Sequence, residues 1–334
     1  MNYLKINNVK AGMVLSRPVI GDNGNVLLGA QAKISVTVLE RLKSMGYQGI
    51  YIDMPAFADI YVEDSISQDV RTKAFNAVKT WNIEAAVSAA KLIVKELRYK
   101  DTLTLDLLDI KCDDNYITRH SISVCIFATV IAISHGLTEE QTEQVAVAGI
   151  LHDIGISELK ESVQTSKLIF DTKDMDEMMK HPMISYEIIK DNAHVSSVSR
   201  NAILFHHENL DGSGYYHEFD ERINQFARII RIADTYDSLT SMRPHREAQS
   251  PADAIEYLMA NAGILFDREL VQEFIGKVPI YPTGFTVKLS NGELGVISNN
   301  HMNAMRPEIT LLSGKKIDLS ADPDYRSVMI GEFV

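Results

Sequence analysis

Histidine and aspartate residues gather in one part of this 334-residue chain, between positions 120 and 234. Two of the sites are doublets, since His152 precedes Asp153 after the apolar stretch VAVAGIL, and His206 precedes His207. Asp234 lies in the largely apolar stretch RIIRIADTYDSL. Burying a charged side chain is costly unless it is paired or bound to a metal, so these positions indicate a metal site. The candidate ligands are His120, His152, Asp153, His181, His206, His207 and Asp234.

The types of these side chains restrict the metal. Neutral imidazole together with carboxylate suits Fe, Mn, Zn or Ni, and the absence of cysteine among the candidates argues against a structural thiolate zinc site. Seven ligands exceed the needs of one ion. Two ions that share a carboxylate therefore fit this set better than one ion does.

Long helical patterns extend from about residue 64 to residue 276. All seven candidate ligands lie within this region, so helices must position them. Thr138 and Gln141 form a capping box at the start of the helix that leads to His152. Ser250 and Pro251 are an N-cap and an N1 proline. The apolar stretch 121–134 is shorter than the ~18 to 20 residues that span a bilayer, so we expect a buried helix.

The two ends of the chain have extended patterns instead. Near the N-terminus, short strands surround an amphipathic helix that Gly46 ends. After Pro279, two extended runs around Asn291-Gly292 predict a β-hairpin within a tail of three to five short strands. The predicted fold class is mainly α, with an all-helical core, a small N-terminal α+β module and a short β-rich C-terminal tail. The predicted boundaries are 1–55 for the module, 56–110 for a helical linker, 111–279 for the helical catalytic domain and 280–334 for the tail.

The composition excludes several classes of protein. The chain has 33 Lys and Arg against 45 Asp and Glu, a net charge of −12, and 46% hydrophobic residues, which predicts a globular protein. The acidic balance argues against binding to a nucleic-acid polymer. The N-terminal sequence has no secretory h-region, and Cys112 and Cys125 are the only cysteines, which favours reduced thiols over disulfides. We expect a cytoplasmic protein without a transmembrane segment.

Five motifs follow one another in the region of the candidate ligands. They are HS with Val124 after His120, LHDIG at 151–155, HP at His181, HHENLDGSGY at 206–215 and IADTYDSLTSMRPHR at 232–246. In this order they resemble the HD-GYP family of metal-dependent phosphodiesterases. The resemblance implies an HD-domain core with two or three metal ions, usually iron or manganese. It also implies hydrolysis of the cyclic dinucleotide c-di-GMP to linear pGpG or GMP through a metal-bridging hydroxide, and some members prefer cyclic GMP-AMP. The terminal modules resemble the flanking modules of one branch of the family.

The resemblance also implies roles for single residues. The seven candidates are the expected metal ligands, with Asp153 as the bridge between the ions. Asp153 and Tyr215 are the expected catalytic residues. Asp211, Gly214 and Tyr215 resemble the substrate loop, for which the alternative is a plain surface turn. Arg243 and Arg246 are expected to bind phosphate or guanine, with a solvated helix end as the alternative. A helix that continued nine positions from Asp234 would place Arg243 at the rim of the pocket.

Phosphodiester hydrolysis also agrees with the residues themselves. A phosphodiester is anionic, so its hydrolysis needs a nucleophile at neutral pH and neutralisation of phosphoryl charge, and a dinuclear metal site supplies both. Bound ions would also make the pocket locally cationic in an acidic protein.

Four positions depart from the family pattern. Ile156 stands where Lys is common, Tyr216 where Pro is usual, His245 where an aromatic phenol is usual, and Tyr116 where trinuclear members carry Glu. We therefore expect two ions. The seven retained ligands favour an active phosphodiesterase, which is the predicted function. The missing cation at Ile156 favours the alternative, a catalytically weak cyclic-dinucleotide receptor that retains the metal centre. A general nucleotide phosphohydrolase is a third reading, which the HHENLDGSGY block disfavours. The predicted partners are a cyclic dinucleotide and a second copy of the chain or a signalling protein.

Overall fold

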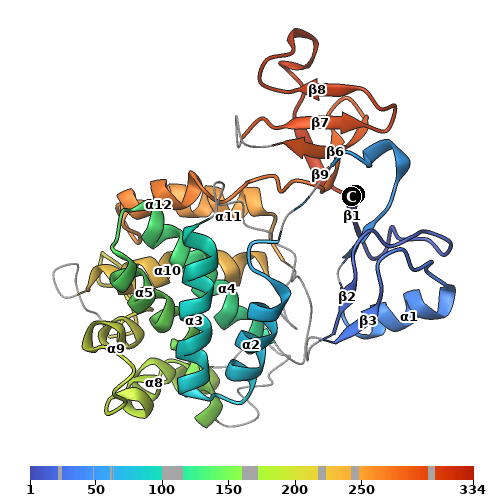
Figure 1. Cartoon of the computed structure of the whole chain (residues 1–334). Coiled ribbons are helices and arrows are strands. Elements are labelled where there is room, and N and C mark those ends of the chain that lie inside the picture. The colour runs from blue at the N-terminus through green and yellow to red at the C-terminus, as the bar shows by residue number, and fades with distance from the viewer. Residues whose placement is uncertain are drawn as a thin grey trace. The chain divides into compact units, whose positions relative to one another are not determined.

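The computed structural model describes two compact units (Figure 1). It describes the chain except for residues 22–24, 48, 61, 63, 100–115, 160–171, 217–222, 242–247 and 300–304. Residues 65–99 and 116–278 belong to a helical unit, and residues 1–64 and 279–334 to a terminal unit. The predicted fold class, a mainly helical protein with a small β-rich C-terminal part, is confirmed. The predicted domain boundaries stay predictions.

The helical unit is built around one apolar helix, α4. Its elements are α2 (Gln68–Lys79), α3 (Ile83–Arg98), α4 (Tyr116–Ser134), α5 (Glu139–Leu151), η2 (Ile154–Glu158), α7 (Thr172–Met178), α8 (His181–Ile189), α9 (Ser197–Leu204), α10 (Gln225–Thr240), α11 (Pro251–Ala260) and α12 (Arg268–Ile275). Helix α4 packs against α5, α10, α2, α3 and α12. By length and composition α4 could cross a membrane, but 72% of its apolar window is buried inside the protein. The predicted burial is therefore confirmed, although the helix is longer than the predicted stretch and burial, not length, identifies it as a core helix.

Local capping determines where several of these helices begin. Helix α5 starts with the predicted capping box, in which Thr138 and Gln141 bond each other's backbone amides. Ser250 caps α11 ahead of Pro251, also as predicted. Asn224 caps α10 by accepting a hydrogen bond from the Ala227 amide. These caps set the starting points of α5 and α10, which carry candidate ligands.

The terminal unit joins both ends of the chain in one core. Its elements are β1 (Asn2–Lys5), β2 (Val19–Ile20), β3 (Val26–Leu28), α1 (Val36–Ser44), β4 (Gly49–Ile52), η1 (Pro55–Phe57), β5 (Thr286–Leu289), β6 (Leu294–Asn299), β7 (Glu308–Leu311), β8 (Lys316–Asp318), η4 (Pro323–Tyr325) and β9 (Ile330–Phe333). Strands β1 and β4 pair antiparallel, as do β2 and β3, while the C-terminal strands form a sheet of order β8-β7-β6-β5-β9. Tyr3 stacks on Phe285 with ring centroids 4.6 Å apart, so β1 packs beside β5.

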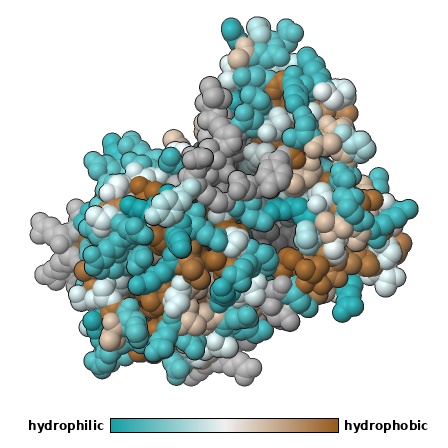
Figure 2. Space-filling view, viewed as in Figure 1, coloured by the Kyte–Doolittle hydropathy of each residue, from teal (hydrophilic) through white to brown (hydrophobic). Residues whose placement is uncertain are grey.

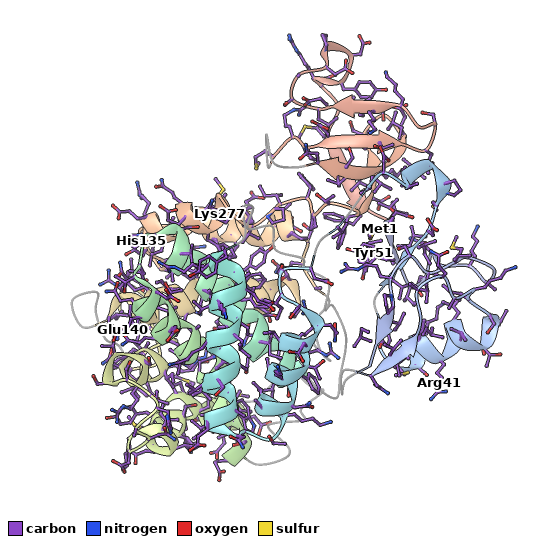
Figure 3. The ribbon with its side chains drawn as sticks, in the orientation of Figure 1. Met1, Arg41, Tyr51, His135, Glu140 and Lys277 are labelled. Atoms are coloured by element: carbon purple, nitrogen blue, oxygen red, sulfur yellow. The ribbon has the colours of Figure 1, made fainter. Side chains whose placement is uncertain are left out.

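Two predicted turns of the terminal unit are confirmed. Gly46 has a φ of 75° and ends α1, and Gly292 has a φ of 89° in the hairpin between β5 and β6. Met1 packs on the core that contains Tyr51, and both residues are labelled in Figure 3. On the face shown in Figure 2, hydrophilic residues alternate with smaller hydrophobic areas.

Candidate metal centre

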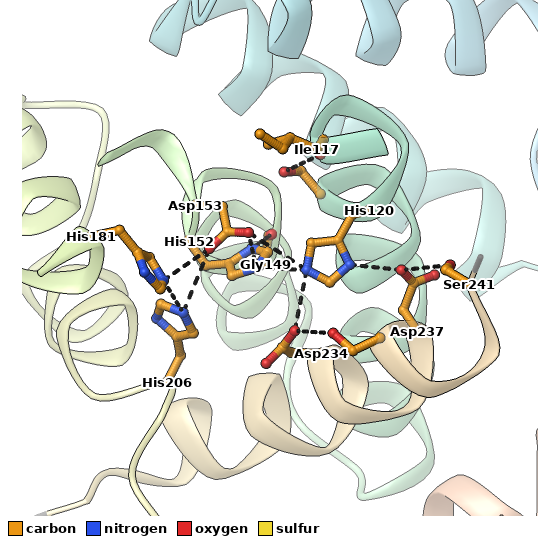
Figure 4. Close-up of polar contacts among 12 residues, drawn as sticks. Ile117, His120, Gly149, His152, Asp153, His181, His206, Asp234, Asp237 and Ser241 are labelled. Atoms are coloured by element: carbon orange, nitrogen blue, oxygen red, sulfur yellow. Dashed lines mark hydrogen bonds and ion pairs between the residues drawn. The ribbon is translucent and has the colours of Figure 1, made fainter. Parts of the chain in front are cut away.

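The seven candidate ligands converge inside the helical unit from segments far apart in the sequence. Figure 4 shows six of them, His120, His152, Asp153, His181, His206 and Asp234. Three groups of ligand atoms, each within 4.8 Å, are His120 with His152 and Asp234, His152 with Asp153 and His206, and His181 with His206 and His207. Because the groups share members, they form one continuous cluster that includes all seven residues.

Each ligand is placed by an element or by its end. His120 lies in α4 and Asp234 in α10, His152 ends α5, Asp153 begins η2, His181 begins α8, and His206 and His207 follow α9.

Gly155 of the HDIG motif allows two of these elements to meet. A Cβ atom at this position would lie 2.3 Å from the carbonyl oxygen of His181 and 2.6 Å from the amide nitrogen of Ser185. No side chain fits there. The Ser185 hydroxyl accepts from the Gly155 amide and donates to the His152 carbonyl, each at 2.8 Å. Glycine and serine therefore hold the His152 segment against α8, which carries His181.

One half of the cluster surrounds His120 and His152. Their Nε2 atoms lie 3.3 Å apart. Oδ1 of Asp234 is 3.2 Å from Nε2 of His120, and Oδ2 of Asp153 is 3.3 Å from Nε2 of His152.

The other half surrounds His181 and His206. Their Nε2 atoms lie 3.2 Å apart, and Oδ1 of Asp153 lies 3.1 Å from Nε2 of His181 and 3.8 Å from Nε2 of His206. Asp153 thus turns one oxygen toward each half. His207 reaches the cluster through Nδ1, which is 3.7 Å from Oδ2 of Asp234.

The hydrogen bonds of Nδ1, which faces away from the cluster, determine whether Nε2, which faces into it, can bind a metal. Nδ1 of His152, His181 and His206 each lies 2.6 to 2.8 Å from a backbone carbonyl oxygen, which can only accept a hydrogen bond. Nδ1 therefore carries the hydrogen, and in neutral rings Nε2 presents a lone pair to the interior. The lone pairs of His181 and His206 face each other at 3.2 Å, where they repel unless a cation lies between them.

The donor set fits divalent transition ions. With metal–nitrogen bonds of about 2.1 Å, two ligands of one ion lie roughly 3 to 3.4 Å apart, which matches both Nε2 pairs. The oxygen and nitrogen donors are those that Fe, Mn and Zn accept. The residues thus fit a divalent metal centre.

Electrostatics keep most of these groups ready to bind a cation. Burial raises the pKa of Asp153, but His152 and His181 outweigh it and hold this pKa well below its usual range. Burial, together with His152 and His181, lowers the pKa of His206 to about 3. Burial also lowers the pKa of His207. Ionised carboxylates and neutral imidazoles are the states that metal binding requires.

His120 is the exception. Burial lowers its pKa, but Tyr116, Asp234 and Asp237 outweigh burial and raise the pKa well above its usual value. Its Nδ1 lies 2.7 Å from Oδ2 of Asp237, which makes a charge-assisted hydrogen bond. Sequence reasoning missed Asp237. Its signal was its spacing, since it follows Asp234 by three positions and so lies on the same face of α10.

The predicted substrate loop lies beside the second half of the cluster. The Tyr215 ring stacks on His207 with centroids 4.4 Å apart, and it meets His181 edge-on at 6.3 Å. The Asp211 carboxylate accepts hydrogen bonds from the amide and hydroxyl of Ser213, as in a local turn. A Cβ atom on Gly214 would lie 2.5 Å from Cα of Glu208, so close backbone packing requires this glycine.

Arg243, His245 and Arg246 lie outside the described residues. Helix α10 ends at Thr240, and Ser241 has extended backbone angles. The condition for placing Arg243 at the rim, a helix that continues from Asp234 to Arg243, is therefore not met. Ser241 instead donates from its hydroxyl to Asp237, which stabilises the end of α10 beside the cluster.

Three further departures from the family pattern, Ile156, Tyr216 and Tyr116, lie within the described residues. Ile156 is buried within η2, directly after Gly155. Tyr216 donates its amide to Oε1 of Glu208 at 2.8 Å, a bond that proline cannot make, and its hydroxyl accepts from the Met183 amide in the first turn of α8. The Tyr116 ring stacks on His120 with centroids 5.4 Å apart.

The sequence of the chain is similar to those of several known proteins. Residues 105–270 match the family described as HD domain. The cyclic di-GMP phosphodiesterase PA4108 of Pseudomonas aeruginosa is 32% identical over 206 residues, which cover 61% of this chain and 49% of that protein. The cyclic di-GMP phosphodiesterase response regulator RpfG of Xanthomonas campestris is 35% identical over 150 residues, which cover 44% of this chain and 40% of that protein. The 3'3'-cGAMP-specific phosphodiesterase 2 of Vibrio cholerae is 28% identical over 155 residues, 46% of this chain and 30% of that protein. The chain thus spans half or less of the length of these three relatives.

Among solved structures, the HDG"Y"P protein Bd1817 from Bdellovibrio bacteriovorus is similar with a TM-score of 0.49 and 16% identity, over 81% of this chain and 97% of that chain.

Proposed function

Because the chain belongs to the HD-GYP family of HD-domain proteins, we propose that it is a metal-dependent phosphodiesterase that hydrolyses c-di-GMP to linear pGpG, to GMP or to both. The observation that carries this proposal is the buried cluster in which Asp153 lies between two pairs of inward-facing imidazoles. Such a donor set suits two divalent ions, which we propose to be iron or manganese, with Asp153 as the shared ligand.

The bound ions would supply Lewis acidity and lower the pKa of a water molecule, as phosphodiester hydrolysis requires. The protein contributes the arrangement around them. Backbone carbonyls and Asp237 hold the histidine rings with Nε2 inward, which orients the ligands before the metal arrives. Burial of His120, His152, His181 and His206 excludes bulk water from the inner side of the cluster.

The substrate would approach the side of His207 and Tyr215. The side chain of His207 is 17% exposed, whereas those of the other candidate histidines are at most 3% exposed. Tyr215 offers an aromatic face next to His207, and a guanine base can stack on such a face. We propose that Tyr215, with Asp211 and Gly214, forms the substrate loop, and that Arg243 and Arg246 add contacts to phosphate or guanine. A cytoplasmic location and a signalling partner or second copy of the chain stay predictions.

Product analysis tests the proposal directly. Full-length protein loaded with Mn or, anaerobically, with Fe is incubated with c-di-GMP or cyclic GMP-AMP, and the products are separated by chromatography. We expect linear dinucleotide or GMP from c-di-GMP, and no product from the Asp153→Asn variant. His135→Asn is the matched control, because His135 lies just beyond α4 and contacts Gln225 outside the cluster. If cyclic GMP-AMP is hydrolysed faster than c-di-GMP, the protein is still a phosphodiesterase, but cyclic GMP-AMP is its preferred substrate.

A second function has one observation in its favour. Ile156 places a buried apolar side chain where the family commonly has a cation. Without that cation, hydrolysis would be slow, while the retained metal cluster could still bind the cyclic dinucleotide. The protein would then act as a receptor. In the same experiment, intact c-di-GMP after long incubation, together with measurable binding by calorimetry, would favour the receptor over the enzyme.

A further inference from the structure

Arg231 brings a permanent positive charge to the open side of the metal cluster. It lies in α10 one turn before Asp234, and its Nη1 is 3.8 Å from Oδ2 of that residue. The same Oδ2 atom lies 3.7 Å from His207. The side chain of Arg231 is 19% exposed, close to the 17% of His207. Arg231 and His207 are therefore both partly exposed, and both lie beside Oδ2 of Asp234.

Hydrogen bonds connect Arg231 to the predicted substrate loop. Its Nε donates to Oδ1 of Asn209 at 3.0 Å, and Nδ2 of Asn209 donates to the Ser213 hydroxyl at 3.0 Å. The Ser213 hydroxyl in turn donates to Asp211 at 2.6 Å. The guanidinium thus lies between a candidate metal ligand and the loop that includes Asp211.

The guanidinium keeps donors for a ligand. Its contacts to described residues use Nε, toward Asn209, and Nη1, toward Thr235 and Asp234, and none of them uses Nη2. The 3.8 Å separation from Asp234 is longer than a hydrogen bond, so this ion pair does not occupy an N–H donor of Arg231. The Phe266 ring lies 5.6 Å from the guanidinium carbon and supports one face of the group.

A positive charge beside the metal cluster would help this acidic protein to bind an anionic substrate. The chain has a net charge of −12, and a phosphodiester is anionic, so binding needs local positive charge. The buried side chain of Ile156 supplies none.

We propose that Arg231 is a further substrate-binding residue, whose guanidinium contacts a phosphodiester oxygen at the His207 side of the cluster. This inference rests on the proposed phosphodiester chemistry of the same site. A planar guanidinium binds phosphate oxygens through two parallel N–H groups, which also fixes the orientation of the substrate.

Three variants test this inference in Mn-loaded, full-length protein. Arg231→Gln removes the charge, Arg231→Lys keeps a point charge, and Arg228→Gln is the matched control. Arg228 lies one turn earlier in α10 and pairs with Asp267 at 3.3 Å, outside the cluster. The probes are c-di-GMP and inorganic phosphate, with Mn content measured on the same samples. Phosphate is titrated by calorimetry, and c-di-GMP is compared through the KM of its hydrolysis, or by calorimetry where no product forms.

We expect Arg231→Gln to weaken binding of both probes about ten- to a hundred-fold at unchanged Mn content, because a charge-assisted contact is lost. Its binding should also depend less on salt than that of the wild type. Arg231→Lys should recover part of the affinity, and Arg228→Gln should match the wild type.

Other results would overturn the inference. Affinity of Arg231→Gln within twofold of the wild type at full Mn content excludes the contact. Loss of Mn in proportion to loss of binding makes Arg231 a positioning residue for Asp234 instead. If Arg231→Gln does not fold, Arg231→Lys decides, since affinity equal to the wild type would show that the planar group is not used.

The phosphate probe separates this inference from the proposed function. A wild type that binds phosphate but no cyclic dinucleotide contradicts the proposed substrate, while the phosphate titrations of the variants still decide on Arg231. A wild type that binds neither probe refutes both proposals.

Discussion

Replacing Asp237 by asparagine should weaken the binding of one of the two proposed metal ions. Asp237 accepts a hydrogen bond from Nδ1 of His120 at 2.7 Å, so its negative charge makes the ring a stronger donor through Nε2. Asparagine keeps an acceptor oxygen but loses the charge. Loss of such an outer partner typically costs about 10- to 100-fold in metal affinity, which is about 1.4 to 2.8 kcal/mol.

The effect should be confined to the half of the cluster around His120. Nε2 of His120 faces His152 and Asp234, whereas His181 and His206 have backbone carbonyls as their outer partners. A titration of metal-free Asp237→Asn with Mn, followed by electron paramagnetic resonance, should therefore show one site of unchanged affinity and one weakened site.

Controls make this result specific. Asp253→Asn changes an aspartate that bonds Ser250 at the start of α11, and it should bind Mn as the wild type does. Asp237→Ala should weaken the site further, because it leaves the Nδ1 hydrogen of buried His120 without its acceptor. Unchanged Mn affinity in Asp237→Asn, or equal weakening of both sites, would refute the reasoning.

Three further predictions concern the same site. Asp153→Ala should cost the most metal of any single ligand variant, since both of its oxygens face histidine pairs, and full metal content by elemental analysis would show that it is not the bridge. Ile156→Lys should raise turnover, more so in the Arg231→Gln background, because a cation near the reacting phosphoryl group stabilises developing charge; unchanged or lower turnover at full metal content would show that the pocket is built around the apolar side chain. In metal-free protein, the pKa of His206 is about 3 when folded and ~6.5 when unfolded, so unfolding takes up a proton between these values and stability is lost as pH falls through this window, by up to ~1.4 kcal/mol per pH unit. Thermal unfolding of chelator-treated protein at pH 7 and pH 5 should therefore show a smaller loss for His206→Gln than for the wild type, and equal losses would contradict this pKa.

Sequence alone was enough to predict the candidate ligands and the starts of several helices. The ligands stand out because His152, Asp153 and Asp234 are polar or charged in stretches that otherwise predict a hydrophobic core. Helix starts are predictable because a cap such as Thr138 or Ser250 bonds an amide only three residues away. Both signals depend on chemistry that is local in the chain.

Only the tertiary structure decided which side chains support and surround the ligands. Asp237 and Arg231 lie on α10 near Asp234, but their bonds reach His120 on α4 and Asn209 after α9. The pairing of β1 with the segment before β5 likewise joins residues more than 280 positions apart, as in the bond from the Tyr3 amide to the Gly284 carbonyl.

The tautomers of the histidines were also beyond the reach of the sequence. Nε2 of His152 and His206 points into the cluster because the carbonyls of Gly149 and Ile203 accept from Nδ1, three residues back at the end of each helix. A histidine beyond a helix end has this choice only when packing turns its ring toward that carbonyl. Spacing in the sequence therefore selects the residues that can bind a metal, while packing between distant segments determines which of their atoms face it.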